Sequence, residues 1–255
     1  MSEQEMGCCC GLSCCGAAVS IEDEQKAIVR DSYSQRAQSG DLMKLSPCSV
    51  YDRIVEAMEP LEGKRVLDVG SGMGLAVVDL AMRVGPSGKA AGVDFSEAMI
   101  ARAEGLARSK GVDQIAEFRL ADAETGIPYD DGYFDAVITE CVVNLMPNKQ
   151  RVLDEIARVL KPGGRVLLSD TVEVRPMPSE MREDPDLICA CMGGAVTAED
   201  YKRMLAKAGF TSVETLAYKE PSDEAEAKAQ PEGAFKKYRE AAKYVGYALL
   251  VATKG

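Results

Sequence analysis

The feature that most constrains the fold is an alternation of short apolar runs with helical segments between residues 65 and 170. Five runs predict strands, and they read KRVLDV, KAAGVDF, IAEFRLAD, FDAVITE and RVLLSD. Segments with apolar residues at helical spacing follow the first, second and fourth runs. Because parallel strands need crossover connections, this order predicts an α/β fold, with a parallel sheet covered by helices on both faces.

The rhythm changes on either side of this block. Two helices are expected before it, at residues 20–37 behind a Ser cap and at residues 48–58. After it come a capped helix in TAEDYKRMLAKAGF and two further strand-like runs, SVETLAYK and YVGYALLVATK. We therefore expect three regions: a Cys-rich tail (1–18), a ligand-binding domain (19–172), and a C-terminal α+β region (173–255) whose last strand joins the sheet.

The net charge argues against a polyanionic partner. The chain carries 41 acidic and 30 basic residues, a net charge of -11, so most of its surface would repel nucleic acid. No apolar run approaches the ~18 residues that a membrane-spanning helix needs. The N-terminus also lacks the basic and apolar regions of a secretory signal. We expect a soluble cytoplasmic protein without a nucleic-acid or membrane partner.

The amino-acid composition excludes several kinds of catalysis. The chain has no His, which rules out Ser-His-Asp and Cys-His hydrolysis and removes the commonest metal ligand. It has nine Cys, which in a reducing compartment do not indicate a disulfide scaffold. They indicate buried apolar thiols, a site for a soft metal, or redox chemistry.

The first predicted strand runs into a glycine turn, VLDVGSGMG, with glycines at 70, 72 and 74. These glycines allow a tight turn and close approach of the backbone to a ligand. Asp68 precedes the turn, where a pyrophosphate would be disfavoured, and no Lys follows the glycines, so the turn is not a P-loop. Asp94 and Asp122 end the next two strands, placed to meet a ribose and an adenine.

A ligand with a ribose, an adenine and a cationic amino-acid end fits this pattern better than a dinucleotide does. The alternative is that the glycines only shape a turn and that Asp94 caps a helix.

Several thiols are expected at the carboxyl ends of the strands, where open α/β sheets bind ligands. Cys141 directly follows the fourth run, and Cys189 and Cys191 follow the fifth in ICACMGG. Cys48 precedes the first strand and can approach the same edge. For each of them the alternative is an inert core thiol, because free Cys is among the most buried residue types.

Residues 65–170 resemble class I S-adenosylmethionine-dependent methyltransferases in VLDVGSGMG, GVDFSEAMI, ADAETGIPYDDGYFDAV and RVLKPGGRVLLSD. The resemblance implies a Rossmann-like class I sheet. It also implies a set of residues that line the cofactor: Asp68, Gly70, Ser71, Gly72, Gly74, Asp94, Phe95, Met99, Asp122, Ala123 and Glu140.

Three further segments are similar to the arsenite methyltransferases: VRDSYSQRAQSG, ECVVNLMPNKQRVLDEIARVLKPGG and CMGGAVTAEDYKRMLAKAGF. This resemblance implies arsenic detoxification by methylation of trivalent arsenic, with Tyr33 near the cofactor. It assigns the catalytic, arsenic-binding thiols to Cys141, Cys191 and Cys48. Cys189 is additional to that set, and it is a spare ligand, a disulfide partner or neither. It also implies a thiol reductant, glutathione or thioredoxin, as co-substrate.

The chain departs from that family in two places. Its clustered thiols lie early, at residues 8–10 and 14–15, and the context of Cys48, PCSVYD, matches only loosely. The N-terminal clusters either deliver arsenic to the site or form a solvated tail with a minor role.

The proposed chemistry suits a chain without His. Trivalent arsenic held by thiolates keeps a lone pair, and transfer of a methyl group to that lone pair needs no base. Two other functions fit parts of the pattern. One is a methyltransferase acting on carbon, oxygen or nitrogen of a small metabolite, and the other is a non-enzymatic thiol-rich protein that sequesters arsenic or another soft metal.

Overall fold

A computed structural model describes residues 20–39, 48–219 and 236–255. Its centre is one seven-stranded sheet in the order β3-β2-β1-β4-β5-β7-β6. Strands β1 to β5 pair in parallel, whereas β7 is antiparallel to both of its neighbours. The strands are β1 (Arg65–Val69), β2 (Lys89–Asp94), β3 (Ala116–Leu120), β4 (Phe134–Glu140), β5 (Leu160–Glu173), β6 (Phe210–Lys219) and β7 (Val245–Lys254).

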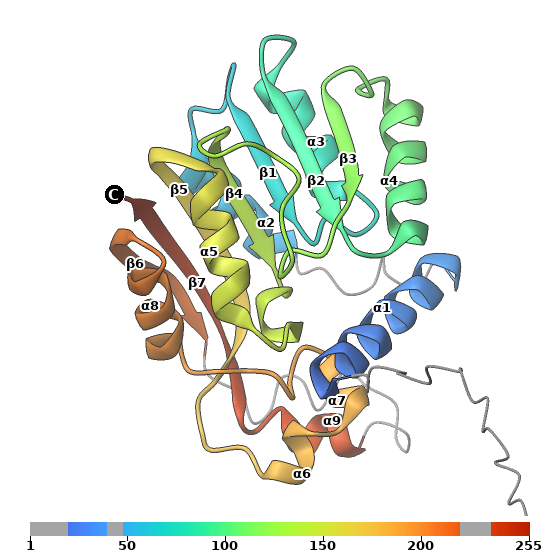
Figure 1. Cartoon of the computed structure of the whole chain (residues 1–255), viewed down its shortest axis with the longest axis vertical. Coiled ribbons are helices and arrows are strands. Elements are labelled where there is room, and N and C mark those ends of the chain that lie inside the picture. Colours follow the sequence, from blue (N-terminus) through green and yellow to red (C-terminus); the bar gives the residue numbers. More distant parts are fainter. Residues whose placement is uncertain (1–19, 40–47, 220–235) are drawn as a thin grey trace, which may run out of the picture.

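Helices cover both faces of the sheet (Figure 1). One face packs α5 and α8 against the strands, and the other packs α2, α3 and α4. The helices are α1 (Ile21–Ser39), α2 (Cys48–Met58), α3 (Leu75–Val84), α4 (Glu97–Lys110), α5 (Lys149–Val159), α6 (Ser179–Arg182), α7 (Pro185–Cys189), α8 (Ala198–Lys207) and α9 (Lys236–Ala241), with a short 3-10 turn η2 (Val143–Leu145). The predicted α/β sheet is confirmed.

Each central strand supplies side chains to both cores. On β1, Val66 points to the face that carries α3, and Leu67 points to the face that carries α5. Neither side chain is exposed. This two-sided burial explains why the strands read as continuous apolar runs rather than as an alternation of apolar and polar residues.

Short polar side chains begin the helices, as the sequence predicts. The Ser20 hydroxyl oxygen accepts a hydrogen bond from the Asp23 amide at 3.1 Å at the start of α1. Thr197 and Asp200 form a complete capping box on α8. These caps satisfy amide groups that the first turn of a helix leaves without partners.

The chain beyond Asp170 completes the same sheet rather than forming a separate one. Strand β5 extends to Glu173, and β7 pairs with it along its length from Arg165. Strand β7 also pairs with β6, so it lies between two strands that precede it in the chain. The predicted Cys-rich tail, residues 1–18, lies outside the described residues.

Helix α1 crosses the carboxyl edge of the parallel strands and lies beside α4 and α7 (Figure 1). Gln25 donates a hydrogen bond to the Leu145 carbonyl at 3.1 Å, and the Ser34 and Ser96 hydroxyls are 2.8 Å apart. Helix α1 therefore covers the carboxyl edge of the sheet, where the functional residues are expected. Over residues 20–39, 48–219 and 236–255, no helix has the length and apolarity that a bilayer crossing requires.

Candidate functional site

The glycine turn lies between β1 and α3 and is shaped by positive φ angles. Gly70, Gly72 and Gly74 have φ of 77, 51 and 79°. A Cβ on Gly70 would collide with the Val142 side chain, and one on Gly74 would lie 2.8 Å from atoms of its neighbours, whereas one on Gly72 would meet no atom within 4 Å. Gly70 and Gly74 therefore permit close packing, while Gly72 faces open space.

Asp94 ties the glycine turn to the beginning of α4. Its carboxylate accepts hydrogen bonds from the Gly72 amide and the Ser96 amide, both at 2.9 Å. The N-cap of α4 is Ser96, whose side chain accepts from the Met99 amide. Asp94 therefore holds the capping residue Ser96 in place but is not itself the N-cap of α4. Its side chain is mostly buried.

Three carboxyl groups gather beside the turn. Burial raises the pKa of Asp68 to about 8, and the charges of Glu140 and Asp94 add to the effect. Burial also raises the pKa of Asp94 and of Glu140. A bound cation would neutralise these charges in a site of low dielectric, so the cluster favours a positively charged ligand.

The buried polar groups of the turn leave an unused hydrogen-bonding position. Ser71 is 8% exposed, and its hydroxyl has no partner among the described residues. Together with the open space at Gly72 and the carboxyl cluster, this orphan hydroxyl fits a polar, cationic cofactor at the turn.

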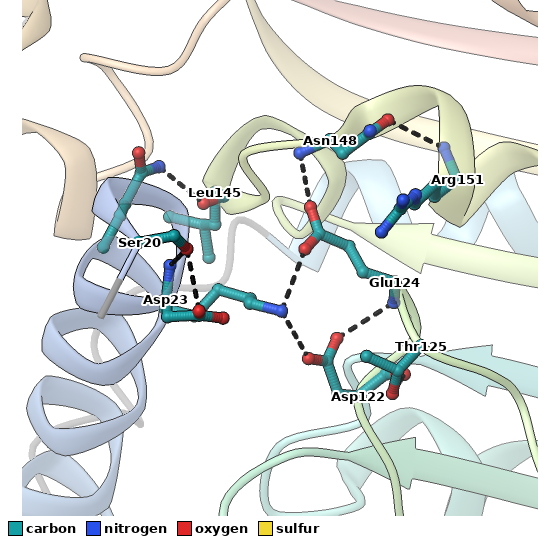
Figure 2. A network of polar contacts seen from close by, with 10 residues as sticks. Ser20, Asp23, Asp122, Glu124, Thr125, Leu145, Asn148 and Arg151 are labelled. Carbon is teal, nitrogen blue, oxygen red and sulfur yellow. Dashed lines mark hydrogen bonds and ion pairs between the residues drawn. The ribbon is translucent and has the colours of Figure 1, made fainter. Parts of the chain in front are cut away.

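The third strand leads to an ion-pair network that the sequence did not indicate (Figure 2). The Lys26 ammonium group on α1 lies 2.9 Å from Asp122 and 3.1 Å from Glu124. Asp122 also accepts a hydrogen bond from the Glu124 amide at 2.9 Å, and Glu124 accepts one from the Asn148 amide. The Asp122 carboxylate predicted to meet an adenine is therefore already paired with α1.

The other residues expected around the cofactor take different positions. Met99 is buried, at 1% exposure, and Ala123 belongs to the core under α5. Phe95 and Tyr33 are partly buried and pack against that same core. Of these four, Tyr33 touches a thiol, which makes it a link between the predicted cofactor site and the cysteines.

Two of the predicted thiols meet at the carboxyl edge. The Cys191 thiol donates a hydrogen bond to the Cys141 carbonyl oxygen at 3.5 Å, and the two thiols lie close enough to influence each other's ionisation. The Tyr33 hydroxyl lies 3.6 Å from the Cys191 sulfur. Cys141 directly follows β4 and Cys191 follows α7, so the fold brings together two residues that are far apart in the sequence.

The environment of Cys141 favours its protonated thiol. The hydrogen bond from Cys191 and burial raise the pKa of Cys141, and the charges of Asp170 and Glu140 act in the same direction. Burial likewise raises the pKa of the Tyr33 hydroxyl. At neutral pH, Cys141 in the resting protein is therefore a thiol rather than a thiolate.

Of the other predicted thiols, the structure describes the side chain of Cys189. Cys189 is the last residue of α7 rather than a loop residue, and it is 5% exposed. Burial raises the pKa of its thiol, and it interacts with Ser32 on α1. Cys48 begins α2, but its side chain lies outside what the structure describes. Among the described residues, no group of three or more Cys, Asp and Glu side chains is arranged to hold a metal ion.

Sequence reasoning missed the buried polar residues beneath the thiol pair. Asn144 is fully buried, and its side-chain amide donates to the Cys191 carbonyl at 2.8 Å. The Asp170 carboxylate accepts from the Asn144 backbone amide and from the Tyr201 hydroxyl, both at 2.9 Å. The signals were the polar Asn within the apolar run VVNLM and the Asp that ends VLLSD.

Comparison with known proteins places this architecture. Residues 60–209 match the methyltransferase domain family, and the chain belongs to that family. It is 44% identical to an arsenite methyltransferase of Halobacterium salinarum over 168 residues, which is 66% of this chain and 42% of that protein. It is 33% identical to the arsenite methyltransferase of Homo sapiens over 161 residues, 60% of this chain and 42% of that one.

A solved structure agrees with these relatives. An arsenic(III) S-adenosylmethionine methyltransferase from Chlamydomonas reinhardtii superposes with a TM-score of 0.61 at 32% identity, over 76% of this chain and 64% of that one. The resemblance to arsenite methyltransferases is thereby confirmed. This chain spans less than half the length of the curated relatives it matches.

Proposed function

We propose that this chain detoxifies arsenic by methylating its trivalent form, arsenite or methylarsenite, with S-adenosylmethionine as methyl donor. The observation that carries the proposal is the meeting of Cys141 and Cys191 next to the glycine turn. Val142, the neighbour of Cys141, packs directly against Gly70. The turn and the thiol pair are therefore adjacent parts of one site.

The residues at the turn suit S-adenosylmethionine. Asp68, Glu140 and Asp94 supply negative charge for the cationic end of the ligand, and Ser71 offers a free hydroxyl. We assign the binding of the cofactor to these residues and to the open backbone at Gly72. The bound cofactor supplies an activated methyl group.

The thiol pair suits trivalent arsenic even though Cys141 is protonated at rest. Arsenite presents hydroxyl groups, so each thiol condenses with arsenic: an As–S bond forms, an As–O bond breaks, and the thiol proton leaves in water. Two such steps release two waters and no net proton. A raised thiol pKa therefore does not oppose binding, and burial protects the sulfur from competing reactions.

The remaining residues of the site have to align the arsenic atom with the methyl donor and to exclude water. The arsenic lone pair is the nucleophile, so no base is required, in agreement with the absence of His. Correct positioning alone can supply roughly 7–11 kcal/mol of the barrier reduction. Val142 contributes an apolar wall between the turn and the thiols, which favours the discharge of a sulfonium.

A reductant completes the cycle. Methylation uses the arsenic lone pair and formally oxidises arsenic by two electrons. Two protein thiols return these electrons by forming a disulfide, for which Cys141 and Cys191 are the best-placed pair, with Cys48 and Cys189 as further candidates. Glutathione or thioredoxin then reduces the disulfide, and this need for reduction favours a cytoplasmic location.

Arsenic speciation tests the proposal. Purified protein is incubated with S-adenosylmethionine, arsenite and glutathione, and arsenic species are separated by chromatography with mass detection. We expect methylated arsenic from the wild type and at least a hundredfold less from Cys141→Ser and Cys191→Ser, because a hydroxyl is a poor ligand for arsenic. Both variants should still bind S-adenosylmethionine in calorimetry.

Three results would redirect the assignment. A wild type that binds S-adenosylmethionine but leaves arsenite unmethylated would favour a small metabolite as methyl acceptor. A chain that binds arsenite tightly but not S-adenosylmethionine would be a sequestering protein. If Cys48→Ser lowers arsenite methylation while it spares methylarsenite, Cys48 is the third arsenic ligand, whereas an unchanged rate for both substrates removes it from the site.

A further inference from the structure

The backbone at the two thiols is strained, and nowhere else among the described non-glycine residues is φ positive. Cys141 has φ of 53° and Cys191 has φ of 62°. Residues with a Cβ avoid this conformation, so it persists only where the surrounding contacts hold it in place. The strain therefore raises the question of which residues impose it on the two cysteines.

The loop of Cys141 is fixed to the sheet on one side. The Cys141 amide donates to the Ser169 carbonyl on β5 at 2.8 Å. Three residues later, the Asn144 amide donates to the neighbouring carboxylate, Asp170. Tyr201 on α8 shares that carboxylate. Strand β5 and helix α8 thus hold Asn144 in one place.

Asn144 in turn holds the loop that carries Cys191. The Asn144 side-chain amide donates to the Cys191 carbonyl at 2.8 Å. Gly194 lies so close to the Asn144 carbonyl that a Cβ there would collide with it. Lys149, a partly buried side chain, donates to the same Asn144 carbonyl at 3.1 Å. One asparagine therefore joins the two thiol-bearing loops through both its side chain and its backbone.

We infer that Asn144 is the positioning residue of the thiol pair: its buried amide holds the Cys191 loop against the Cys141 loop so that both sulfurs face one arsenic atom. This inference deepens the proposed function and rests on it for the identity of the bound atom. The pairing of the two sulfurs itself can be measured without arsenic or cofactor.

The experiment measures how readily the two thiols are bridged. Dibromobimane becomes strongly fluorescent after it alkylates two neighbouring thiols. It is applied to the full chain in a Cys189→Ser background, in which Cys141 and Cys191 are the only thiols of their respective tryptic peptides. Mass spectrometry identifies the bridged pair. The single-alkylation rate of each cysteine with iodoacetamide measures simple exposure.

Asn144→Ala is compared with Asn148→Ala in this background. Asn148 caps α5 four residues further along, so its loss is a matched change away from Cys191. We expect Asn144→Ala to lower the bridging rate and the affinity for arsenite by about tenfold, the effect of leaving one buried acceptor unpaired. We expect it to leave S-adenosylmethionine affinity unchanged, and Asn148→Ala to bridge normally.

A second pair of variants covers the case in which Asn144→Ala does not fold. Gly194→Ala pushes the same loops apart, whereas Gly105→Ala on α4 meets no neighbouring atom. Loss of bridging in Gly194→Ala but not in Gly105→Ala supports the inference. Folded Asn144→Ala or Gly194→Ala that bridges Cys141 to Cys191 at the wild-type rate overturns it. If Cys141 and Cys191 of the wild type are bridged readily but the protein does not bind arsenite, the proposed function is wrong. The positioning role of Asn144 would still stand.

Discussion

The two halves of the site are held together in different ways. The glycine turn is fixed mainly by backbone amides that donate to Asp94 and to the Val93 carbonyl, over a short stretch of chain and the strand beside it. The thiol half is fixed by buried side chains from η2, β5 and α8, which hold a loop 47 residues further along the chain. Local backbone geometry therefore builds one half, and tertiary packing builds the other.

This difference predicts different sensitivities. The glycine half should fail when a single side chain is added to it, because its turn needs positive φ and close packing. The thiol half should fail when a buried polar contact is removed. Helix α1 touches both halves, through Ser34, whose hydroxyl lies 2.8 Å from that of Ser96 beside Asp94, and through Tyr33, which lies against Cys191.

The largest effect is expected where the halves meet. Gly70→Ala adds a Cβ that collides with Val142 at a residue with φ of 77°, and we expect a loss of about 3 kcal/mol in the free energy of unfolding. Gly72 has a positive φ but open space around it, so Gly72→Ala should lower the free energy of unfolding by only about 1 kcal/mol. Chemical denaturation measures both.

The double variant Gly70→Ala with Val142→Ala isolates the collision. If the halves touch as described, removing the Val142 branches restores part of the stability lost in Gly70→Ala. Equal losses for Gly70→Ala and Gly72→Ala would mean that the turn does not pack against the thiol loop.

The next effect concerns the helix that spans both halves. Lys26→Met leaves Asp122 and the nearly buried Glu124 without their cation, and we expect a loss of about 2 kcal/mol. Amide hydrogen exchange should accelerate in α1 in particular. Arg30→Met, which removes an exposed pair with Asp31, should change stability by less than about 0.5 kcal/mol. Unaltered exchange in α1 would show that Lys26 does not hold the helix down.

A smaller effect tests the strain at the thiols. Cys141→Gly should be about 1 kcal/mol more stable than Cys141→Ala, because glycine adopts positive φ without cost. At Cys189, which lies in helix α7, the order should reverse. Cys189→Ala should be more stable than Cys189→Gly, because alanine favours the helix more than glycine does. Thermal unfolding of the four variants gives both comparisons. The same order at both positions would argue against strain at Cys141.

A pH dependence in the glycine half provides a further test. Asp68 has a pKa of about 8, raised from its ordinary value by burial, so it is mostly protonated at pH 7. A bound cation favours the carboxylate, hence binding of S-adenosylmethionine at pH 7 should release a proton, and affinity should rise from pH 6 to pH 8 and level off above. In the free protein the sign is opposite: stability falls as pH rises from about 4 to about 8, because the unfolded chain ionises Asp68 first.

Calorimetry in buffers of different ionisation enthalpy counts the released proton. Asp68→Asn should bind without this proton release and with a flatter pH profile. Proton release that persists in Asp68→Asn would move the titration to another group.

The difference between the two halves also explains which features of the structure could be predicted from the sequence. Strands, caps and the glycine turn depend on neighbours within a short stretch, and patterns within that stretch predict them. The Lys26 network, the Asn144 contact and the place of β7 depend on residues brought together from distant segments. Positive φ at Cys141 and Cys191 was also beyond prediction, because that conformation favours Gly and Asn over Cys.

The insertion of β7 between β5 and β6 has a consequence for the order of folding. During synthesis β6 leaves the ribosome before β7, yet the sheet offers it no partner until β7 has paired with β5. The edge of β5 is therefore left without its β7 partner while about seventy residues are made, and unpaired strand edges of this kind favour aggregation.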